Sequence, residues 1–219
     1  MTKTKKQAPI WVLAVYSICL YGVWTVYHFF ILPHIIRIPN ELSSALTNDA
    51  VCKNLIWTLP AFLLIRKYSD VLAVKKDEFF TWKKEYAKYL LIFPAFAAYI
   101  LAGIYLHGGS PAFSITISEI VTVIFVGLTE ELVFRGWLLN ATADRNENAA
   151  IAVNAVMFLM IHFPRWIKEC VFVTNMTQLG FISIIVLSVL FSVLFLRTKN
   201  ILLPISLHMF WDFLIFYLY

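Results

Sequence analysis

The sequence predicts an all-α fold, a polytopic bundle of about seven transmembrane helices in a single domain that covers residues 1–219. Composition is the first reason, because 61% of the residues are hydrophobic and only 14% are charged, whereas soluble domains carry about 25% charged residues. Apolar stretches recur along the whole chain, and about 20 such residues cross a bilayer as a helix. No hydrophilic block is long enough to fold alone, which excludes a soluble domain with one anchor.

Turn residues and charges separate the expected spans. The first span ends before Pro33 and is too long for a signal peptide, so it is expected to be retained. Lys53 is expected near the outer end of the second span, where its ammonium can reach water. The polar stretch 165–178 is expected to form an interfacial helix or a loop. The spans are Ile10–Leu32, Ala50–Ile65, Tyr86–Leu106, Phe113–Leu139, Ala149–Phe163, Gly180–Leu196 and Ile201–Tyr219.

Basic residues predict the orientation, because Lys and Arg concentrate on the cytoplasmic side of a membrane. With a cytoplasmic N-terminus, the outer loops hold only Arg37, Arg165 and Lys168. The segment 68–88 then lies inside, as an amphipathic surface segment or as a solvated loop. The inner segments hold Lys3, Lys5, Lys6, Arg66, Lys67, Lys75, Lys76, Lys83, Lys84, Lys88, Arg145, Arg197 and Lys199.

Several functional classes find no support in the chain. The net charge of +5 is explained by the basic inner loops and does not indicate nucleic-acid binding. Cys19, Cys52 and Cys170 are scattered without a CxxC pair, so free thiols are expected. No internal repeat occurs, and an inverted-repeat transporter is therefore not favoured.

Ionisable residues within the apolar segments indicate function. A charged side chain at mid-bilayer costs roughly 2.5–3.5 kcal/mol on insertion scales. Three of the expected spans nevertheless carry such groups, in the stretches TEELVFRG, FLMIH and HMFWD. The residues are Glu130, Glu131, Arg135, His162, His208 and Asp212.

These residues can meet at one depth. At about 1.5 Å per residue, Glu130 lies about 13 Å from the inner end of its span, His162 about 18 Å and His208 about 10 Å. Residues four apart share a helix face, which pairs Glu131 with Arg135 and His208 with Asp212. Glu130 is about 100° from Glu131 around the helix, so it is left to face a cavity.

A carboxylate and two imidazoles can activate water in two ways. Glu130 can act as a general base for a water that the histidines hold. Alternatively, His162, His208 and Glu130 match the two-histidine, one-acid ligand set of a catalytic Zn²⁺ site. The HExxH motif of soluble zinc proteases and the GxSxG motif of serine hydrolases are absent. Both routes stay open.

The three motifs, in this order, resemble those of the CAAX-protease and bacteriocin-processing (CPBP, or Abi) family of intramembrane proteases. TEELVFRG resembles its EExxxR motif, Phe158–His162 its FxxxH motif, and His208–Asp212 its HxxxN or HxxxD motif. The motif-bearing half covers about residues 113–219. The resemblance implies an endopeptidase with Glu130 as general base, histidines that hold water or a metal, Glu131 and Arg135 as a pair shaping the site, and a cavity open to the cytoplasm.

One position departs from many members of that family. They carry Asn where this chain has Asp212, and an ionised Asp cannot donate a hydrogen bond to an oxyanion. Asp212 is therefore expected to be protonated, to orient His208 or to join a metal shell.

The expected partners are a membrane-associated peptide or protein substrate and the lipid bilayer, with no nucleic acid. The expected location is a bacterial plasma membrane, with a role in bacteriocin self-immunity or in peptide or prenyl-protein processing. Two alternatives remain, a non-catalytic immunity or scaffold protein and an ion- or proton-translocating bundle.

Overall fold

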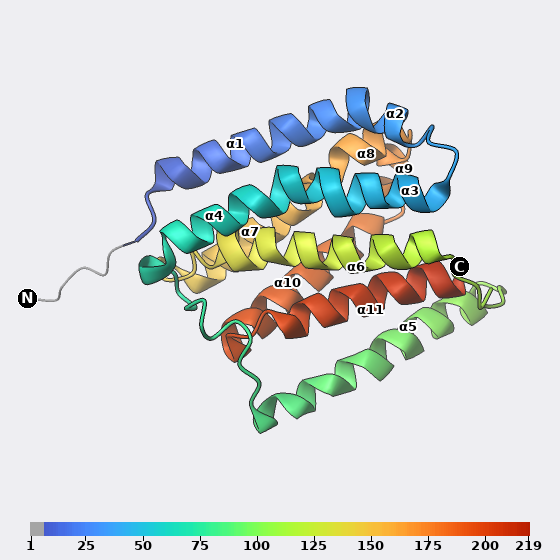
Figure 1. Cartoon of the computed structure of the whole chain (residues 1–219). Helices are drawn as coiled ribbons and strands as arrows, with labels where there is room; N and C mark the ends of the chain where they lie inside the picture. The colour runs from blue at the N-terminus through green and yellow to red at the C-terminus, as the bar shows by residue number, and fades with distance from the viewer. Residues whose placement is uncertain (1–6) are drawn as a thin grey trace, which may run out of the picture.

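The computed structural model describes residues 7–219, which form an all-helical bundle without a strand (Figure 1). Four helical segments are long and apolar enough to cross a membrane, and a shorter apolar helix, Leu202–Leu218, follows them. This confirms an integral membrane protein of the all-α class, while the number of seven crossings stays a prediction. The four segments are Ile10–Ile35, Lys84–Leu106, Glu147–Lys168 and Gly180–Thr198.

The N-terminal half forms two long rods that contain π-helical turns. In the first, α1 (Ile10–Val26) continues through the π-turn Tyr27–Ile31 into α2 (Leu32–Ile35). The rod passes Pro33, where the sequence predicted its end, because proline is tolerated in the first turn of a helix.

The second rod is longer than predicted. It begins at Glu41, because Asn40 caps it by accepting a hydrogen bond from the Ser43 amide. Its segments are α3 (Glu41–Ala45), the π-turns Leu46–Cys52 and Asn54–Thr58, and α4 (Leu59–Lys67).

The C-terminal half supplies the motif-bearing helices. Thr116 and Glu119 form a capping box that starts α6, so the helix begins four residues later than predicted. The polar stretch after α7 forms two short helices, α8 and α9, as expected for an interfacial segment. The elements are α5 (Ile92–Leu106, after the 3₁₀ turn Lys84–Leu91), α6 (Ile117–Glu131), the π-helix Leu132–Leu139, α7 (Glu147–Met160), α8 (Phe163–Lys168), α9 (Phe172–Thr177), α10 (Gly180–Thr198) and α11 (Leu202–Leu218).

A close contact between α6 and α11 sets the relative position of two motifs. A Cβ atom on Gly127 would lie 2.6 Å from Cγ of Met209 and 3.2 Å from its backbone nitrogen. Only glycine allows the two backbones to approach this closely. Met209 follows His208, and Gly127 precedes Glu130 by one turn, so the glycine brings the two helices together at the polar layer.

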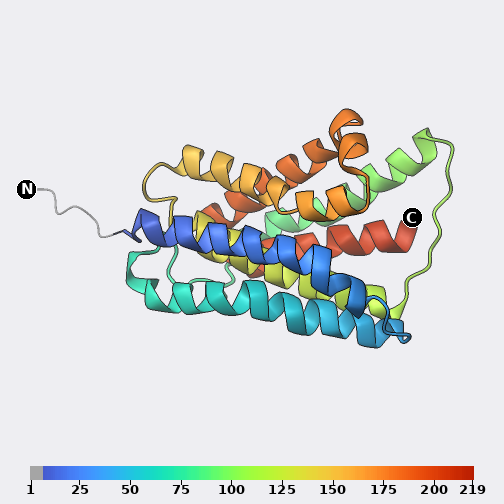
Figure 2. The ribbon, with the colours of Figure 1, turned by 90° about the horizontal axis from the view of Figure 1, so that it is seen from above.

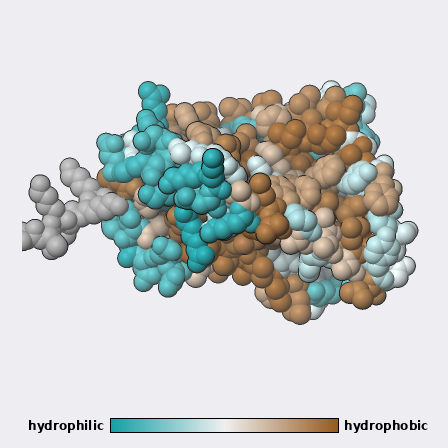
Figure 3. All heavy atoms as spheres, turned by 90° about the horizontal axis from the view of Figure 1, so that it is seen from below, coloured by the Kyte–Doolittle hydropathy of each residue, from teal (hydrophilic) through white to brown (hydrophobic). Residues whose placement is uncertain are grey.

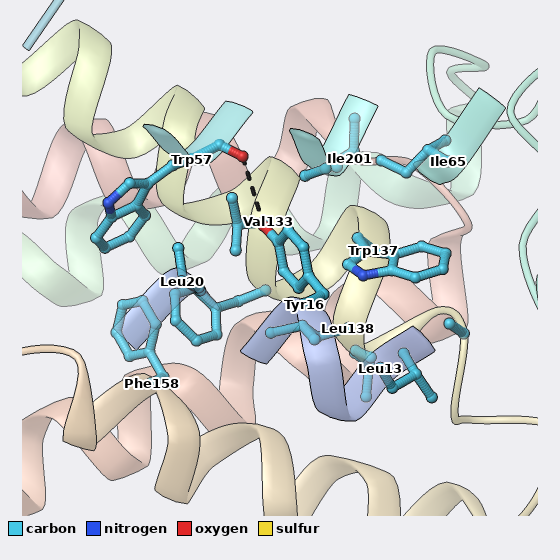
Figure 4. Packing of buried hydrophobic residues seen from close by; sticks show 14 of the residues in the cluster. Leu13, Tyr16, Leu20, Trp57, Ile65, Val133, Trp137, Leu138, Phe158 and Ile201 are labelled. Atoms are coloured by element: carbon cyan, nitrogen blue, oxygen red, sulfur yellow. Dashed lines mark hydrogen bonds between the residues drawn. The ribbon is translucent and has the colours of Figure 1, made fainter. Parts of the chain in front are cut away.

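The core is largest around the π-helix Leu132–Leu139. Val133, Phe134, Trp137 and Leu139 have no exposed surface. Figure 4 shows Tyr16 of α1 packed between Val133 and Trp137, with its hydroxyl donating a hydrogen bond of 3.4 Å to the carbonyl of Trp57. The bundle is therefore closed over this section of the helix.

The segment 68–88 folds against one end of the bundle and is not a plain solvated loop. Leu72 and Phe79 are buried. The Asn140 side chain accepts from the Val74 amide at 2.6 Å and donates to the Val74 carbonyl at 2.9 Å. Asn200 donates to the Thr81 carbonyl at 2.8 Å. Figure 3 shows hydrophilic residues gathered at this end and a mostly hydrophobic surface over the middle of the bundle.

The opposite end carries different elements. In Figures 1 and 2, α2, the start of α3, α8, α9 and the C-terminus lie at the end away from the 68–88 segment. We call these the α8 end and the 68–88 end of the bundle.

Candidate active site

Glu131 and Arg135 form a fully buried pair at the centre of the bundle. Arg135 Nη1 donates to Oε1 of Glu131 at 2.9 Å, as the four-residue spacing predicts. Arg135 Nη2 donates to the hydroxyl of Ser188 at 2.9 Å and to its carbonyl at 3.0 Å. The guanidinium carbon lies 4.6 Å from the ring centre of Phe158. The pair thus connects α6, the following π-helix and α10, and holds a carboxylate in place below the cavity.

His208 is held by the same carboxylate. Its Nδ1 lies 2.8 Å from Oε1 of Glu131, and since an ionised carboxylate only accepts hydrogen bonds, Nδ1 is the donor. Its Nε2 lies 3.6 Å from Oδ2 of Asp212 and 3.9 Å from Oε2 of Glu130. The ring therefore stands between the structural carboxylate and the two carboxylates that face the cavity.

Glu130 has a second partner that the sequence did not predict. Its Oε1 accepts a hydrogen bond of 2.9 Å from Nζ of Lys53, and both side chains are buried. The ammonium also lies 5.1 Å from the ring centre of Trp57. The expectation that Lys53 extends to the outer surface is wrong, because the rod begins at Glu41 and Lys53 is near its middle. The Asn40 cap was the local signal for this earlier start.

His162 lies in the turn between α7 and α8 and lines the same cavity. Its Nδ1 lies 2.8 Å from the Phe158 carbonyl, so Nδ1 is the donor and Nε2 of the neutral ring is free to accept. Asn154, two turns earlier, does not line the cavity. It donates to the Phe134 carbonyl at 2.8 Å and accepts from Ser192 at 3.4 Å, and so bridges helices.

A cavity of about 570 Å³ joins these groups. Its inner part is bounded by Lys53, Glu130 and His208. The walls then extend toward the α8 end along α1, α2, the π-turn Leu46–Cys52, α6, α8 and α11. The other lining residues are Trp24, His28, Leu32, Ile36, Asn48, Asp49, Trp57, Thr122, Val126, Ile161, His162, Arg165, Glu169, Asp212, Ile215 and Phe216.

Two buried polar groups in the cavity wall were not predicted from the sequence. His28, which looks incidental in the sequence, is 5% exposed and packs its ring 4.4 Å from Trp24. Asp49 is 4% exposed and accepts from Thr122 at 2.8 Å and from Asn48 at 2.8 Å. In the predicted spans, His28 lies at the outer end of the first and Asp49 lies just before the second, so neither was assigned to the site.

Comparison with family models decides the class of the protein. The model of the type II CAAX prenyl endopeptidase Rce1-like family matches residues 111–214, a range that contains all six motif residues named above. The C-terminal part of the chain, from the loop before α6 into α11, therefore matches a family of membrane proteases. Comparisons with curated proteins and with solved structures give no match.

The match makes this chain similar to membrane proteases of the Rce1-like type. It favours the endopeptidase interpretation over the ion-translocating bundle and the scaffold. The match begins at the loop before α6 and ends within α11, so Lys53, His28 and Asp49 of the N-terminal half lie outside it. Half of the cavity wall of this Rce1-like protein is therefore built from residues that the family model does not cover.

The Zn²⁺ alternative does not fit the arrangement of these side chains. Across residues 7–219, no group of three His, Cys, Asp or Glu side chains is placed to hold a metal ion. Lys53 also places a positive charge on Glu130 at 2.9 Å, where a metal would need that carboxylate as a ligand.

Proposed function

We propose that this Rce1-like protein is an intramembrane endopeptidase in which Glu130 activates the attacking water. The observation that carries the proposal is the different use of two adjacent carboxylates. Glu131 is fully buried and contacts Arg135 and His208. Glu130 lines the cavity, and within residues 7–219 its Oε2 accepts no hydrogen bond from the protein. Glu130 can therefore accept a proton from a water in the cavity.

The proposed reaction uses the side chains of Glu130 and His162. A water held by Nε2 of His162 transfers a proton to Oε2 of Glu130 while its oxygen bonds to the peptide carbonyl carbon. The carbonyl π electrons move to the oxygen and form an oxyanion. When the C–N bond breaks, these electrons return to form the C=O bond and Glu130 gives its proton to the leaving nitrogen. The products are an acid and an amine, and the enzyme is restored.

Lys53 supports the charge changes in this sequence. Glu130 loses its negative charge when it accepts the proton, at the moment when negative charge appears on the carbonyl oxygen. The ammonium, which Glu130 holds in the ground state at 2.9 Å, can then pair with the oxyanion. A preorganised cation at such a position stabilises the transition state more than the ground state.

Asp212 serves a different purpose from the Asn of related motifs. An ionised Asp212 would repel an oxyanion, and it lies 3.6 Å from Nε2 of His208. We propose that it orients His208 together with Glu131, which fixes the ring from both nitrogens. Lys53 then takes the electrophilic role that Asp212 cannot fill.

The proposed setting is a bacterial plasma membrane, and the proposed substrates are membrane-associated peptides or proteins. Bacteriocin self-immunity and peptide or prenyl-protein processing both use such substrates.

The test is peptide-bond cleavage by the purified protein in lipid nanodiscs. A membrane protein extract is incubated with the wild type or with Glu130→Gln, and new peptide termini are identified by mass spectrometry. We expect termini that the wild type produces and Glu130→Gln does not. Equal termini with both proteins would refute Glu130 as the base. If Glu131→Gln folds normally and only loses cleavage, the two glutamates exchange roles.

A further inference from the structure

The cavity opens toward the α8 end of the bundle. Its lining residues on α6, Thr122 and Val126, precede Glu130, whereas those on α11, Asp212, Ile215 and Phe216, follow His208. Since α6 and α11 run in opposite directions (Figure 1), both sets lie on the same side of the polar layer. Arg165 and Glu169 of the α8 region line the cavity as well and pair with each other at 2.9 Å.

Packed side chains close the cavity in the other direction. The residues after Glu130 toward the 68–88 end include Val133, Phe134 and Trp137, none of which has exposed surface. Below them, Asn140 and Asn200 attach the 68–88 segment to the bundle. Closely packed interiors of this kind have no space for water or a peptide. The cavity therefore opens away from the basic loops, whereas the family resemblance implies an opening to the cytoplasm.

The distribution of charge assigns the two ends to the two sides of the membrane. Basic loops mark the cytoplasmic side of membrane proteins. The 68–88 end carries ten basic residues, and the α8 end carries three, Arg37, Arg165 and Lys168. The ten are Arg66, Lys67, Lys75, Lys76, Lys83, Lys84, Lys88, Arg145, Arg197 and Lys199. The closed end therefore faces the cytoplasm.

We infer that the active-site cavity opens on the non-cytoplasmic side of the membrane, and that its substrate is a polypeptide presented there. An exported peptide or the outer part of a membrane protein meets this requirement, and a protein prenylated in the cytosol does not. The inference thus narrows the substrates proposed above and leaves prenyl-protein processing out. The substrate class rests on the proposed peptidase function, whereas the direction of opening does not. Labelling experiments test the direction without any measurement of activity.

The first experiment determines which end is outside. Cys170 is an exposed native thiol next to α8. In a Cys19→Ser, Cys52→Ser background it should react with a membrane-impermeant maleimide in intact spheroplasts. The matched control adds Cys170→Ser and Asp70→Cys, which moves the thiol to an exposed position near the 68–88 end without removing a Lys or Arg. This control should react only after the membrane is broken.

The reverse pattern, or labelling of both proteins in intact spheroplasts, would overturn the assignment. If Cys170 does not react even in broken membranes, Ser110→Cys replaces it, because Ser110 is exposed in the loop at the same end.

The second experiment tests the cavity itself. In a background without native cysteines, Val126→Cys and Val133→Cys place thiols four residues before and three residues after Glu130 on one continuous helix. Val126 lines the cavity and Val133 has no exposed surface. A small impermeant methanethiosulfonate should modify Val126→Cys in intact spheroplasts and should leave Val133→Cys unmodified. Modification of Val133→Cys, or of Val126→Cys only from the cytoplasmic side, would refute the inference.

Discussion

Nζ of Lys53 lies 2.9 Å from Oε1 of Glu130, and the two residues are 77 positions apart in the sequence. This contact joins the N-terminal rod to the family motif and places a buried cation beside the proposed general base. It also gives the buried Glu130 carboxylate a partner of opposite charge, which a buried charge requires.

Replacement of Lys53 tests its proposed electrostatic role. We expect Lys53→Met to lower kcat by about 10²–10³, the effect of removing one oxyanion-stabilising group, with a smaller change in KM. Lys53→Arg keeps the charge and should recover part of kcat. Cleavage kinetics with a peptide from the nanodisc experiment measure both. A purely structural role would be indicated if both variants lost the same amount of kcat.

Replacement of Asp212 tests whether this residue only orients His208 and whether its negative charge is needed. In the wild type, Oδ2 of Asp212 lies 3.6 Å from Nε2 of His208. Asp212→Asn removes a negative charge from the cavity but keeps a polar side chain that can contact this nitrogen. We expect kcat to rise, because less negative charge opposes the oxyanion. A fall of about 10² or more in kcat, the size of one lost oxyanion-hole group, would show that the charge of Asp212 is itself required.

The buried and exposed arginine pairs give a matched comparison of stability. Arg135→Ala leaves Glu131 buried without its partner, which costs about 3–5 kcal/mol of unfolding free energy. Arg165→Ala removes the ion pair with Glu169, which has the same distance of 2.9 Å but side chains that are 63% and 48% exposed. This change should cost about 0–1 kcal/mol of unfolding free energy. Thermal unfolding in detergent measures both. Similar losses for the two variants would contradict the structural role of Arg135.

Gly127 is expected to determine the spacing of α6 and α11. Gly127→Ala places a methyl group 2.6 Å from Cγ of Met209, and overpacking of this kind costs about 1–3 kcal/mol. Met209→Ala in the same chain should recover part of the lost stability, because it removes the contacting atom. Gly22→Ala is the control, since no atom lies within 4 Å of its added Cβ. An equal effect at both glycines would refute the close contact as the cause.

Metal analysis tests whether the two-histidine, one-acid set binds Zn²⁺ in the membrane. We expect the wild type and His208→Ala to contain the same background of metal, and cleavage to continue after treatment with a chelator. Near-stoichiometric Zn²⁺ that is lost in His208→Ala would overturn the metal-free activation of water by Glu130. It would also require Lys53 to move away from Glu130 when the metal binds. Glu130→Gln in the same measurement identifies the third ligand.

The sequence by itself determined the helical membrane class and the motif residues. Hydropathy and the four-residue helical period are local properties, so they identified Glu131 with Arg135 and His208 with Asp212 as pairs before any fold was known. The start of α6 was also readable in retrospect, since Thr116 and Glu119 form a local capping box. Orientation in the membrane and the number of crossings stay predictions.

Only the tertiary structure decided what surrounds Glu130 and where its cavity leads. The Lys53 contact depends on how a rod from the N-terminal half packs against α6, and no local pattern encodes a contact over 77 residues. The direction of the cavity likewise depends on which side of the polar layer the packed side chains fill. Val133, Phe134 and Trp137 are as apolar as residues that face lipid, and their burial follows only from the neighbours that the folded bundle places around them.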